Sequence, residues 1–561
     1  MVAPRPRPGR LLSALLPILL LTLVGLPSAL HAQDGDLALG KEVYDRWCAA
    51  CHGWDGAGDG PAAGYMLPRP RDFTRGLYQI RTTPGGEIPT DQDILHVINK
   101  GMPGTTMPGW ESQLPRRQRE ALVAYLKSFY PPFETLPAPQ SVEFGRPGRV
   151  SDERLAEGRL FYDSIECWQC HGGAGRGDGP SVPELEDDWG FPARPADLTK
   201  NWMFSGGATV EDIYRALLTG LDGSPMPANS DLIDAGFMTQ DQLWSLAHYV
   251  RSLSPERTPR IREVIRAERA DPGEVPSSVG DERWEEVEPF YVPLVGQIII
   301  SPRWFDPAVS GVWIQAMHDG EDLALRLSWN DRSRSPDPAW MAWQERVLEV
   351  MEPREGDPVE PGERPDRFAV QFPPTIPTGM DRPYFLMGDA RNPVYLWQWR
   401  SDQAGAERAT ARGMREIAPL DEGVLVTDSH WEAGEWQLLL RRPLLTEDGA
   451  GVLQFEEGVS IPVAFFAWDG DNSEEGTRGS ISSWFFIHLE QEVPATTFVA
   501  PLVAFLLTGG MGLLVVARAQ RREREAEGDP RADRPLPGAG SGSPEPTGTH
   551  PHPHPHSEDE V

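Results

Sequence analysis

Cysteine is scarce in this chain of 561 residues: only four are present, and all lie in two Cys-x-x-Cys-His motifs, Cys48–His52 and Cys167–His171. No cysteine is left over, which excludes a fold held by disulfide bonds. Positive charge is also in short supply, because 52 Lys and Arg stand against 84 Asp and Glu, a formal net charge of -32. Nucleic acid is excluded as a partner, since binding it requires clustered basic side chains. The acidic surface favours basic or cationic partners.

The N-terminus has the pattern of a secretory signal peptide. Three arginines precede an apolar stretch over residues 11–30, and a cleavage site fits after Ala32. A retained N-terminal anchor is the alternative. Removal of a signal peptide predicts that the functional domains lie outside the cytoplasm.

A second apolar run, Thr497–Ala517, carries no charge over 21 residues, about the length that a bilayer core requires. Four arginines follow between residues 518 and 524, and basic residues mark the cytoplasmic side of a span. A buried core helix is the alternative. The pattern predicts a large periplasmic or extracytoplasmic region, a single pass through the cell membrane and a short cytoplasmic tail.

The chain contains an internal repeat. A shift of 119 residues places Cys48, Cys51, His52 and Met107 on Cys167, Cys170, His171 and Met226. Gly40 matches Gly158 with an offset of one residue, and Arg69-Pro-Arg-Asp matches Arg194-Pro-Ala-Asp after an insertion of six residues. Two homologous domains of roughly 100 residues explain this repetition better than chance.

Both repeats have the periodicity of helices. A short helix is expected before each Cys motif, and apolar spacing predicts helices over 91–100 and 116–129, matched by 210–219 and 239–253. The Pro/Gly-rich stretch 131–148 is expected to link the repeats. The charged stretch 256–281 is expected to be a second linker with some helix.

The periodicity changes to two from about residue 287 to residue 490, which is typical of strands. Strands are expected over 323–329, 435–440, 459–468 and 483–489, with turns at 318–320 and 469–472. Several short strands without long helices between them predict an antiparallel β-sandwich. Residues after 523 are rich in Pro, Gly, Ser and acids, and are expected to be disordered.

The predicted fold class is therefore multidomain: two all-α domains, an antiparallel β-sandwich and one C-terminal transmembrane helix. The expected boundaries are 1–32 for the signal peptide, 33–132 and 151–256 for the helical domains, 133–150 and 257–285 for the linkers, 286–492 for the sandwich, 497–517 for the transmembrane helix and 518–561 for the tail.

The Cys-x-x-Cys-His motif is the attachment signal for covalent c-type haem. Two thiols at this spacing reach both vinyl groups of one haem, and the adjacent His52 or His171 becomes the proximal ligand of the iron. For a single motif, a redox-active dithiol or half of a zinc site is the alternative. Two motifs in matched repeats behind a signal peptide favour two covalent haems.

Met107 and Met226 are the expected distal ligands, since each lies 55 residues after its proximal histidine and directly precedes a proline. A thioether ligand raises the haem potential, which suits electron transfer. Met102 competes in the first repeat, but Leu221 takes its place in the second. Two further histidines that lack a histidine counterpart are interpreted as surface or structural residues: His96 and His248.

These motifs resemble those of the class I cytochrome c family over residues 36–130 and 151–255. The resemblance implies three helices around a haem whose edge meets solvent. By position, Arg69 and Arg194 would be partners of the haem propionates, and the alternative for both is an exposed loop charge.

Three stretches of the sandwich resemble the haem-binding γ-subunit domain of ethylbenzene dehydrogenase and its dimethylsulfide, selenate or chlorate relatives: 383–399, 434–444 and 467–484. The resemblance implies a b-haem held non-covalently between a methionine and a lysine. Met387 matches the methionine, with a core methionine as the alternative.

The matching lysine is missing. Gly479 stands near its place, and the last lysine of the chain is Lys200. Arg478 is a poor substitute, because a guanidinium stays protonated. The site could be five-coordinate, empty, or completed by His318, His430 or His488. We therefore expect b-haem binding to be weakened or lost, and a lysine written at Gly479 to tighten it.

The sequence thus favours a membrane-anchored dihaem electron-transfer protein rather than an enzyme. The family resemblance implies a partner of the molybdenum oxidoreductase type, with a soluble cytochrome or a membrane oxidase as the other redox partner. A dihaem peroxidase and a sandwich that binds a ligand or a protein are the alternatives. The histidines between 550 and 556 could bind a transition metal weakly, or form a polar tail.

Overall fold

The computed structural model describes residues 26–351, 362–377, 382–420, 425–447, 451–492, 494 and 496–527, with side chains from residue 36. The chain divides into two compact units, Met1–Gln491 and Glu492–Val561. Most of the expected signal peptide, the tail after residue 527 and its histidines lie outside the described residues.

The first repeat is helical. Its main elements are α2 (Leu26–Trp47), α3 (Ala49–His52), α4 (Asp91–Lys100), α5 (Arg116–Ser128) and α6 (Pro132–Thr135), with 3-10 turns η1 (Ala63–Tyr65) and η2 (Phe73–Arg75). Helix α4 begins where the Thr90 side chain accepts from the amide of Asp93 and ends at Gly101, an arrangement that satisfies free backbone groups at both ends. The helices predicted over 91–100 and 116–129 are confirmed.

The second repeat has the same series of helices: α7 (Asp152–Ser164), α8 (Trp168–His171), α9 (Val210–Thr219), α10 (Ser230–Asp234) and α11 (Gln240–Ser252), with η3 (Val182–Glu184) and η4 (Asn201–Met203). Thr209 caps α9 as Thr90 caps α4. Helix α2 crosses α5 at Gly40, and α7 crosses α11 at Gly158. A Cβ at Gly40 would lie 2.8 Å from the Ala121 carbonyl carbon, and one at Gly158 would lie 2.6 Å from Tyr249 Cβ.

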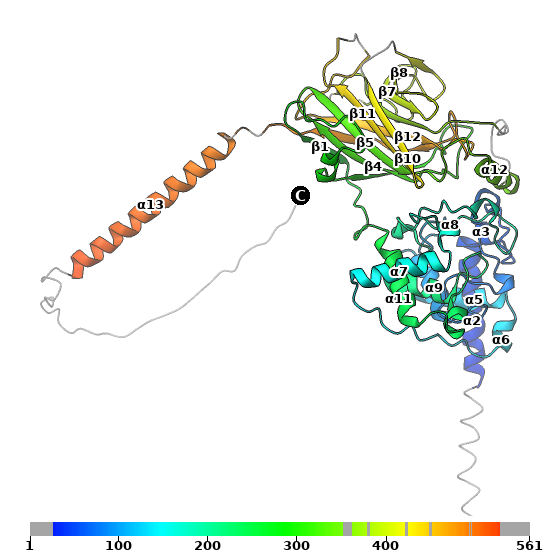
Figure 1. Ribbon diagram of the computed structural model, residues 1–561. Coiled ribbons are helices and arrows are strands. Elements are labelled where there is room, and N and C mark those ends of the chain that lie inside the picture. The colour runs from blue at the N-terminus through cyan, green and yellow to red at the C-terminus, as the bar shows by residue number, and fades with distance from the viewer. Residues whose placement is uncertain are drawn as a thin grey trace, which may run out of the picture. The chain divides into compact units, whose positions relative to one another are not determined.

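The C-terminal half of the first unit consists mainly of strands (Figure 1). They are β1 (Val264–Arg269), β2 (Phe290–Pro293), β3 (Val295–Gly296), β4 (Gly311–His318), β5 (Asp322–Asn330), β6 (Arg367–Phe372), β7 (Val394–Arg400), β8 (Glu407–Ala411), β9 (Ile417–Pro419), β10 (Val426–Glu432), β11 (Glu435–Pro443), β12 (Ser460–Trp468), β13 (Ser480–Ile481) and β14 (Phe485–Leu489).

These strands run in the order β10-β11-β5-β4-β1-β14-β12-β6-β7-β8-β9. Strand β12 joins two layers, because Ser460–Val463 pair with β14 whereas Ala464–Trp468 pair with β6. The core lies between the layers: Trp329 of β5 stacks on Phe368 of β6 at a centroid distance of 4.6 Å. The four predicted strands are confirmed, and they belong to one large sheet. The prediction that all pairing is antiparallel is wrong, because β1 pairs in parallel with β4 and β14.

The stretch 257–285 differs from the expected linker. It contributes β1, which pairs in parallel with both β4 and β14, and Trp284, which is fully buried in η5 (Glu282–Glu286). The expectation of helix over 256–281 is therefore wrong. Ile265 and Ala267 alternate with exposed neighbours, so their burial between two strands overrides the helix-favouring charged composition. Helix α12 (Pro338–Val350) is a further addition to the sandwich.

The second unit contains α13 (Thr496–Glu527), drawn in orange in Figure 1. Its segment Thr496–Ala526 is long and apolar enough to cross a membrane. The predicted apolar helix over 497–517 is confirmed as a helix.

Candidate functional site: a cavity shared by both Cys-x-x-Cys-His motifs

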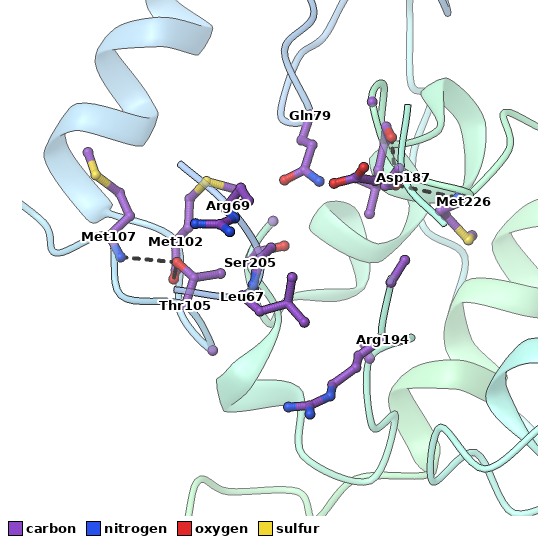
Figure 2. A pocket seen from close by; sticks show the side chains of 18 of the residues that line it. Leu67, Arg69, Gln79, Met102, Thr105, Met107, Asp187, Arg194, Ser205 and Met226 are labelled. Carbon is purple, nitrogen blue, oxygen red and sulfur yellow. Dashed lines mark hydrogen bonds between the residues drawn. The ribbon is translucent and has the colours of Figure 1, made fainter. Parts of the chain in front are cut away.

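One continuous cavity of about 1150 Å³ contains both motifs. Its wall includes Cys48, Cys51 and His52 from the first repeat and Cys167, Cys170 and His171 from the second. Figure 2 shows Met102, Met107 and Arg69 on one side of this space and Met226 and Asp187 on the other. The volume lies just above the roughly 300–1,000 Å³ of an ordinary small-molecule pocket.

Each proximal histidine is oriented in the same way. Nδ1 of His52 lies 3.0 Å from the carbonyl oxygen of Arg71, and Nδ1 of His171 lies 3.0 Å from that of Ala196. A carbonyl only accepts, so Nδ1 is the donor and Nε2 keeps a lone pair for a metal. Burial lowers the pKa of both imidazoles, which favours this neutral, ligating form.

The cysteines lie beside these histidines on a short helix. Burial raises the pKa of Cys48 and of Cys167 to about 12. Redox-active Cys-x-x-Cys motifs depend on the opposite shift, a lowered thiol pKa. The surroundings therefore disfavour the alternative of a redox-active dithiol.

The one-residue offset between the repeats has a local cause. Helix α2 leads directly into Cys48, whose amide donates to the carbonyl of Tyr44, four residues earlier. The amide of Cys167 donates to the carbonyl of Tyr162, five residues earlier. Glu166 takes up the extra residue with a φ of 59°, a value uncommon outside glycine. The hydroxyls of Tyr44 and Tyr162 then donate to matching carbonyls, Gly53 and Gly172.

The expected distal residues lie in matched loops. The amide of Met102 donates to the carbonyl of Met107 at 3.0 Å, and the amide of Leu221 donates to that of Met226 at 3.1 Å. Met102, Met107 and Met226 all line the cavity. The described lining includes neither of the competing histidines, His96 and His248.

Arg69 and Arg194 both line the cavity, but their guanidinium groups also reach the sandwich. Arg194 forms a two-pronged ion pair with Asp306, at 2.6 and 2.8 Å, and lies over the ring of Trp343. Arg69 donates to the carbonyl oxygens of Ala63 and Val350. These arginines therefore attach the repeats to the sandwich, a role that the sequence did not indicate.

Three polar side chains on the cavity wall were missed by sequence reasoning. Arg71 Nη1, Tyr78 Oη and Trp110 Nε1 are buried and have no hydrogen-bond partner in the part of the chain that the structure describes. Burial raises the pKa of Tyr78 and lowers that of Arg71 to about 10, which leaves a phenol and a guanidinium ready to donate. Unpaired buried donors are costly, and they fit the propionate carboxylates of a haem. The only signal for them was the position of Arg71 inside the repeated Arg-Pro-Arg-Asp stretch.

Family models match most of this region. Residues 35–126 match the model described as cytochrome c oxidase, cbb3-type, subunit III, residues 155–254 match cytochrome c, and residues 281–417 match ethylbenzene dehydrogenase. The chain combines cytochrome c domains with an ethylbenzene dehydrogenase-like domain. The cytochrome c domains imply covalent haem c, in agreement with the attachment motifs and the donors on the cavity wall.

Relatives of known description share parts of the chain. A protein of Haloferax mediterranei described as a respiratory nitrate reductase haem subunit is 25% identical over 44% of this chain and 81% of its own length. The chlorate reductase γ subunit of Ideonella dechloratans is 28% identical over 30% of this chain and 62% of its own length. A chain of the reducing HAO-like protein complex of Kuenenia stuttgartiensis is 45% identical, covers 39% of this chain and 96% of that chain, and has a TM-score of 0.37.

Met387 of the ethylbenzene dehydrogenase-like domain packs against core side chains among the described residues. This side chain is fully buried in a cluster with Leu386, Met414, Trp468 and others on one face of β6 and β7. A Cβ at Gly479 would lie 2.6 Å from two atoms of the Trp468 ring, so the place of the missing lysine is filled by the indole. The described residues fit a packed core better than a b-haem.

The three candidate histidines lie on β4, β10 and β14, whereas Met387 packs against β6 and β7. His318 is buried at the end of β4, with Nδ1 3.9 Å from a Glu457 carboxylate oxygen. His430 is exposed on β10, and His488 contacts Ser460 at 3.2 Å. All three lie in the other layer of the sandwich.

Proposed function

We propose that this chain is the electron-transfer subunit of a respiratory complex, holding two covalent c-haems. The observation that carries the proposal is the single cavity that contains both Cys-x-x-Cys-His motifs. Haem bound there would supply reversible one-electron chemistry. Sequence similarity to haem subunits of nitrate and chlorate reductases supports a partner of the molybdenum oxidoreductase type.

The residues have separable roles in this proposal. Cys48 and Cys51 in one repeat, and Cys167 and Cys170 in the other, would attach the haems. His52 and His171 would be proximal ligands, held by the carbonyls of Arg71 and Ala196. Met107 and Met226 would be distal ligands, whose thioethers favour a raised potential.

The wall between the repeats would neutralise and shield the propionates. Arg71 of the first repeat stacks on Trp189 of the second, with its guanidinium carbon 4.8 Å from the ring centroid. Trp189 lies in the loop that is longer by six residues in the second repeat. Arg71, Arg69 and Arg194 would therefore serve groups that share one cavity.

The sandwich would be a docking and support element without a b-haem. It is attached to the second repeat by buried or partly buried polar contacts, including Arg194 with Asp306 and Arg176 with Glu435 at 2.8 Å. The proposed domains are 33–132, 151–256 and 286–492, with β1 added to the last. Helix α13 would anchor the chain to the cell membrane in a single pass, with the haem domains outside.

Near-infrared spectroscopy of the oxidised chain tests the axial ligands, because sulfur-ligated ferric haem gives a weak charge-transfer band. Met107→Ala and Met226→Ala should each remove about half of this band and lower one of two redox potentials. Met102→Ala is the matched control, since Met102 lines the same cavity, and it should leave the band intact. A band that survives in Met107→Ala but not in Met102→Ala would contradict the assignment.

The alternative of a dihaem peroxidase is tested with the same variants. An enzyme of that kind needs an open or displaceable distal position on one haem. The wild-type chain should therefore not turn over hydrogen peroxide and should not bind cyanide rapidly. The Met226→Ala variant, which lacks the distal thioether, should bind cyanide rapidly. Rapid peroxide turnover by the wild type would favour the peroxidase.

A further inference from the structure

Three buried carboxylates meet at one end of the sandwich. Asp331 directly follows β5, Asp366 directly precedes β6 and Asp469 directly follows β12. One oxygen from each lies within 4.8 Å of the others. Their exposed fractions are 2%, 0% and 6%, so water does little to screen their mutual repulsion.

Hydrogen bonds leave this cluster incomplete. Asp366 accepts from the amides of Ser335 and Gly470, both at 3.0 Å, and from Trp436 Nε1. Asp469 accepts from the amide of Asn472 at 3.0 Å. Asp331 accepts from the amide of Ser333 through Oδ1 at 3.4 Å, but its Oδ2 is buried and has no hydrogen-bond partner among the described residues. Asp331 contributes one oxygen to the three that converge, and that oxygen is either this Oδ2 or the Oδ1 of the same carboxylate.

No ion pair within the described residues neutralises the three carboxylates. Among the described residues, no Lys, Arg or His nitrogen forms an ion pair within 4.0 Å of any of them; Arg332, next to Asp331 in the sequence, interacts with Asp469 only at longer range. Buried charges without a partner are strongly unfavourable. Burial and mutual repulsion raise the pKa of Asp331 and Asp469 well above the usual range when nothing else is bound.

We propose that Asp331, Asp366 and Asp469 bind a divalent cation, and that calcium is its identity. Hard oxygen ligands select calcium or magnesium over softer metals. Calcium binds oxygen at about 2.3–2.6 Å, so ligands on opposite sides of the ion lie up to about 5 Å apart, which agrees with the spacing here. Asp331 and Asp469 also line the cavity, where water could complete the six to eight oxygens that calcium takes.

The site has a direct route to the second cytochrome c domain. Asn330, next to Asp331, donates to the Asp197 carboxylate and to Thr199 Oγ1 at 3.2 Å. Asp197 directly follows Ala196, whose carbonyl orients His171. Calcium would thus fix the end of β5 and, through it, the loop beneath the proximal histidine. Only this last consequence depends on the proposed function; the cation site does not.

Calcium binding is measured on the full, detergent-solubilised chain after treatment with EGTA. Titration with calcium chloride should show one ion per chain. Calcium at about 100 times its dissociation constant should raise the unfolding temperature of the sandwich by roughly 5–10 °C. Asp331→Asn and Asp469→Asn should weaken binding at least about tenfold, whereas Asp402→Asn, an exposed aspartate after β7, should bind as the wild type does.

The outcomes are distinguishable. No binding and no temperature shift in the wild type would overturn the site, as would equal binding by the wild type and both variants. If the variants do not fold, removal and readdition of calcium in the wild type decide alone. Calcium binding that leaves the near-infrared band of the second domain unchanged would support the cation site and refute its link to His171.

Discussion

Replacement of Gly158 by alanine should destabilise the second cytochrome c domain. Gly158 lies where α7 crosses α11, and an added Cβ would lie 2.6 Å from Tyr249 Cβ and closer still to the Ser245 carbonyl oxygen. These are backbone or near-backbone atoms, so a change of rotamer cannot relieve the contact. The two helices would have to separate.

The magnitude follows from two opposing effects. Alanine in a helix is favoured over glycine by about 1 kcal/mol. Overpacking a well-filled site costs about 1–3 kcal/mol, and more where nothing can move. Because the close contacts are with backbone or Cβ atoms, we take the overpacking cost at about 3 kcal/mol, which leaves a net loss of about 2 kcal/mol. This loss corresponds to a fall of roughly 10 °C in the unfolding temperature of a domain of about 100 residues.

Thermal unfolding of the full chain, followed by loss of the near-infrared sulfur-to-iron band, measures this effect. Gly173→Ala is the matched control, because it lies in the same domain and a Cβ there would meet nothing within 4 Å. Gly40→Ala should produce a similar loss in the first domain, where Ala121 and Tyr125 are the neighbours. If Gly158→Ala and Gly173→Ala unfold at the same temperature, the close crossing of α7 and α11 at Gly158 is wrong.

Three further predictions concern the other parts of the chain. Protease added to spheroplasts should remove the haem domains and spare a C-terminal tag, and digestion of the tag would contradict the topology. Asp306→Asn should destabilise the attachment of the second repeat to the sandwich by about 2–5 kcal/mol. In a double-mutant cycle, adding Arg194→Met should cost little more, and additive losses would contradict an ion pair between Arg194 and Asp306. Contrary to the expectation from the sequence, Gly479→Lys should lower stability without creating haem binding, because its Cβ would meet the Trp468 ring. Tight haem binding by this variant would instead support the b-haem hypothesis.

Local signals made the cytochrome c repeats predictable. A threonine cap and a terminal glycine delimit α4 and α9, so the residues themselves indicate where these helices begin and end. The attachment motifs are equally local, since five consecutive residues carry them. The sandwich strands were recognisable because short apolar segments with a period near two lie between turn residues.

Long-range packing hid the rest. Half of residues 264–269 are charged, and only the pairing with β4 and β14 reveals them as a strand. The shared cavity depends on Arg71 meeting Trp189, 118 residues away, and no spacing rule predicts that contact. Asp331, Asp366 and Asp469 are likewise distant in sequence, so their convergence is visible only in the fold.

The pyridine haemochrome spectrum of the purified chain tests the central claim most directly, because it counts c-type and b-type haem separately. The structure predicts two c-haems per chain, resistant to acidified acetone, and no b-haem. A single c-haem would contradict the use of both motifs in the shared cavity. One stoichiometric b-haem would contradict the interpretation of Met387 as a core residue.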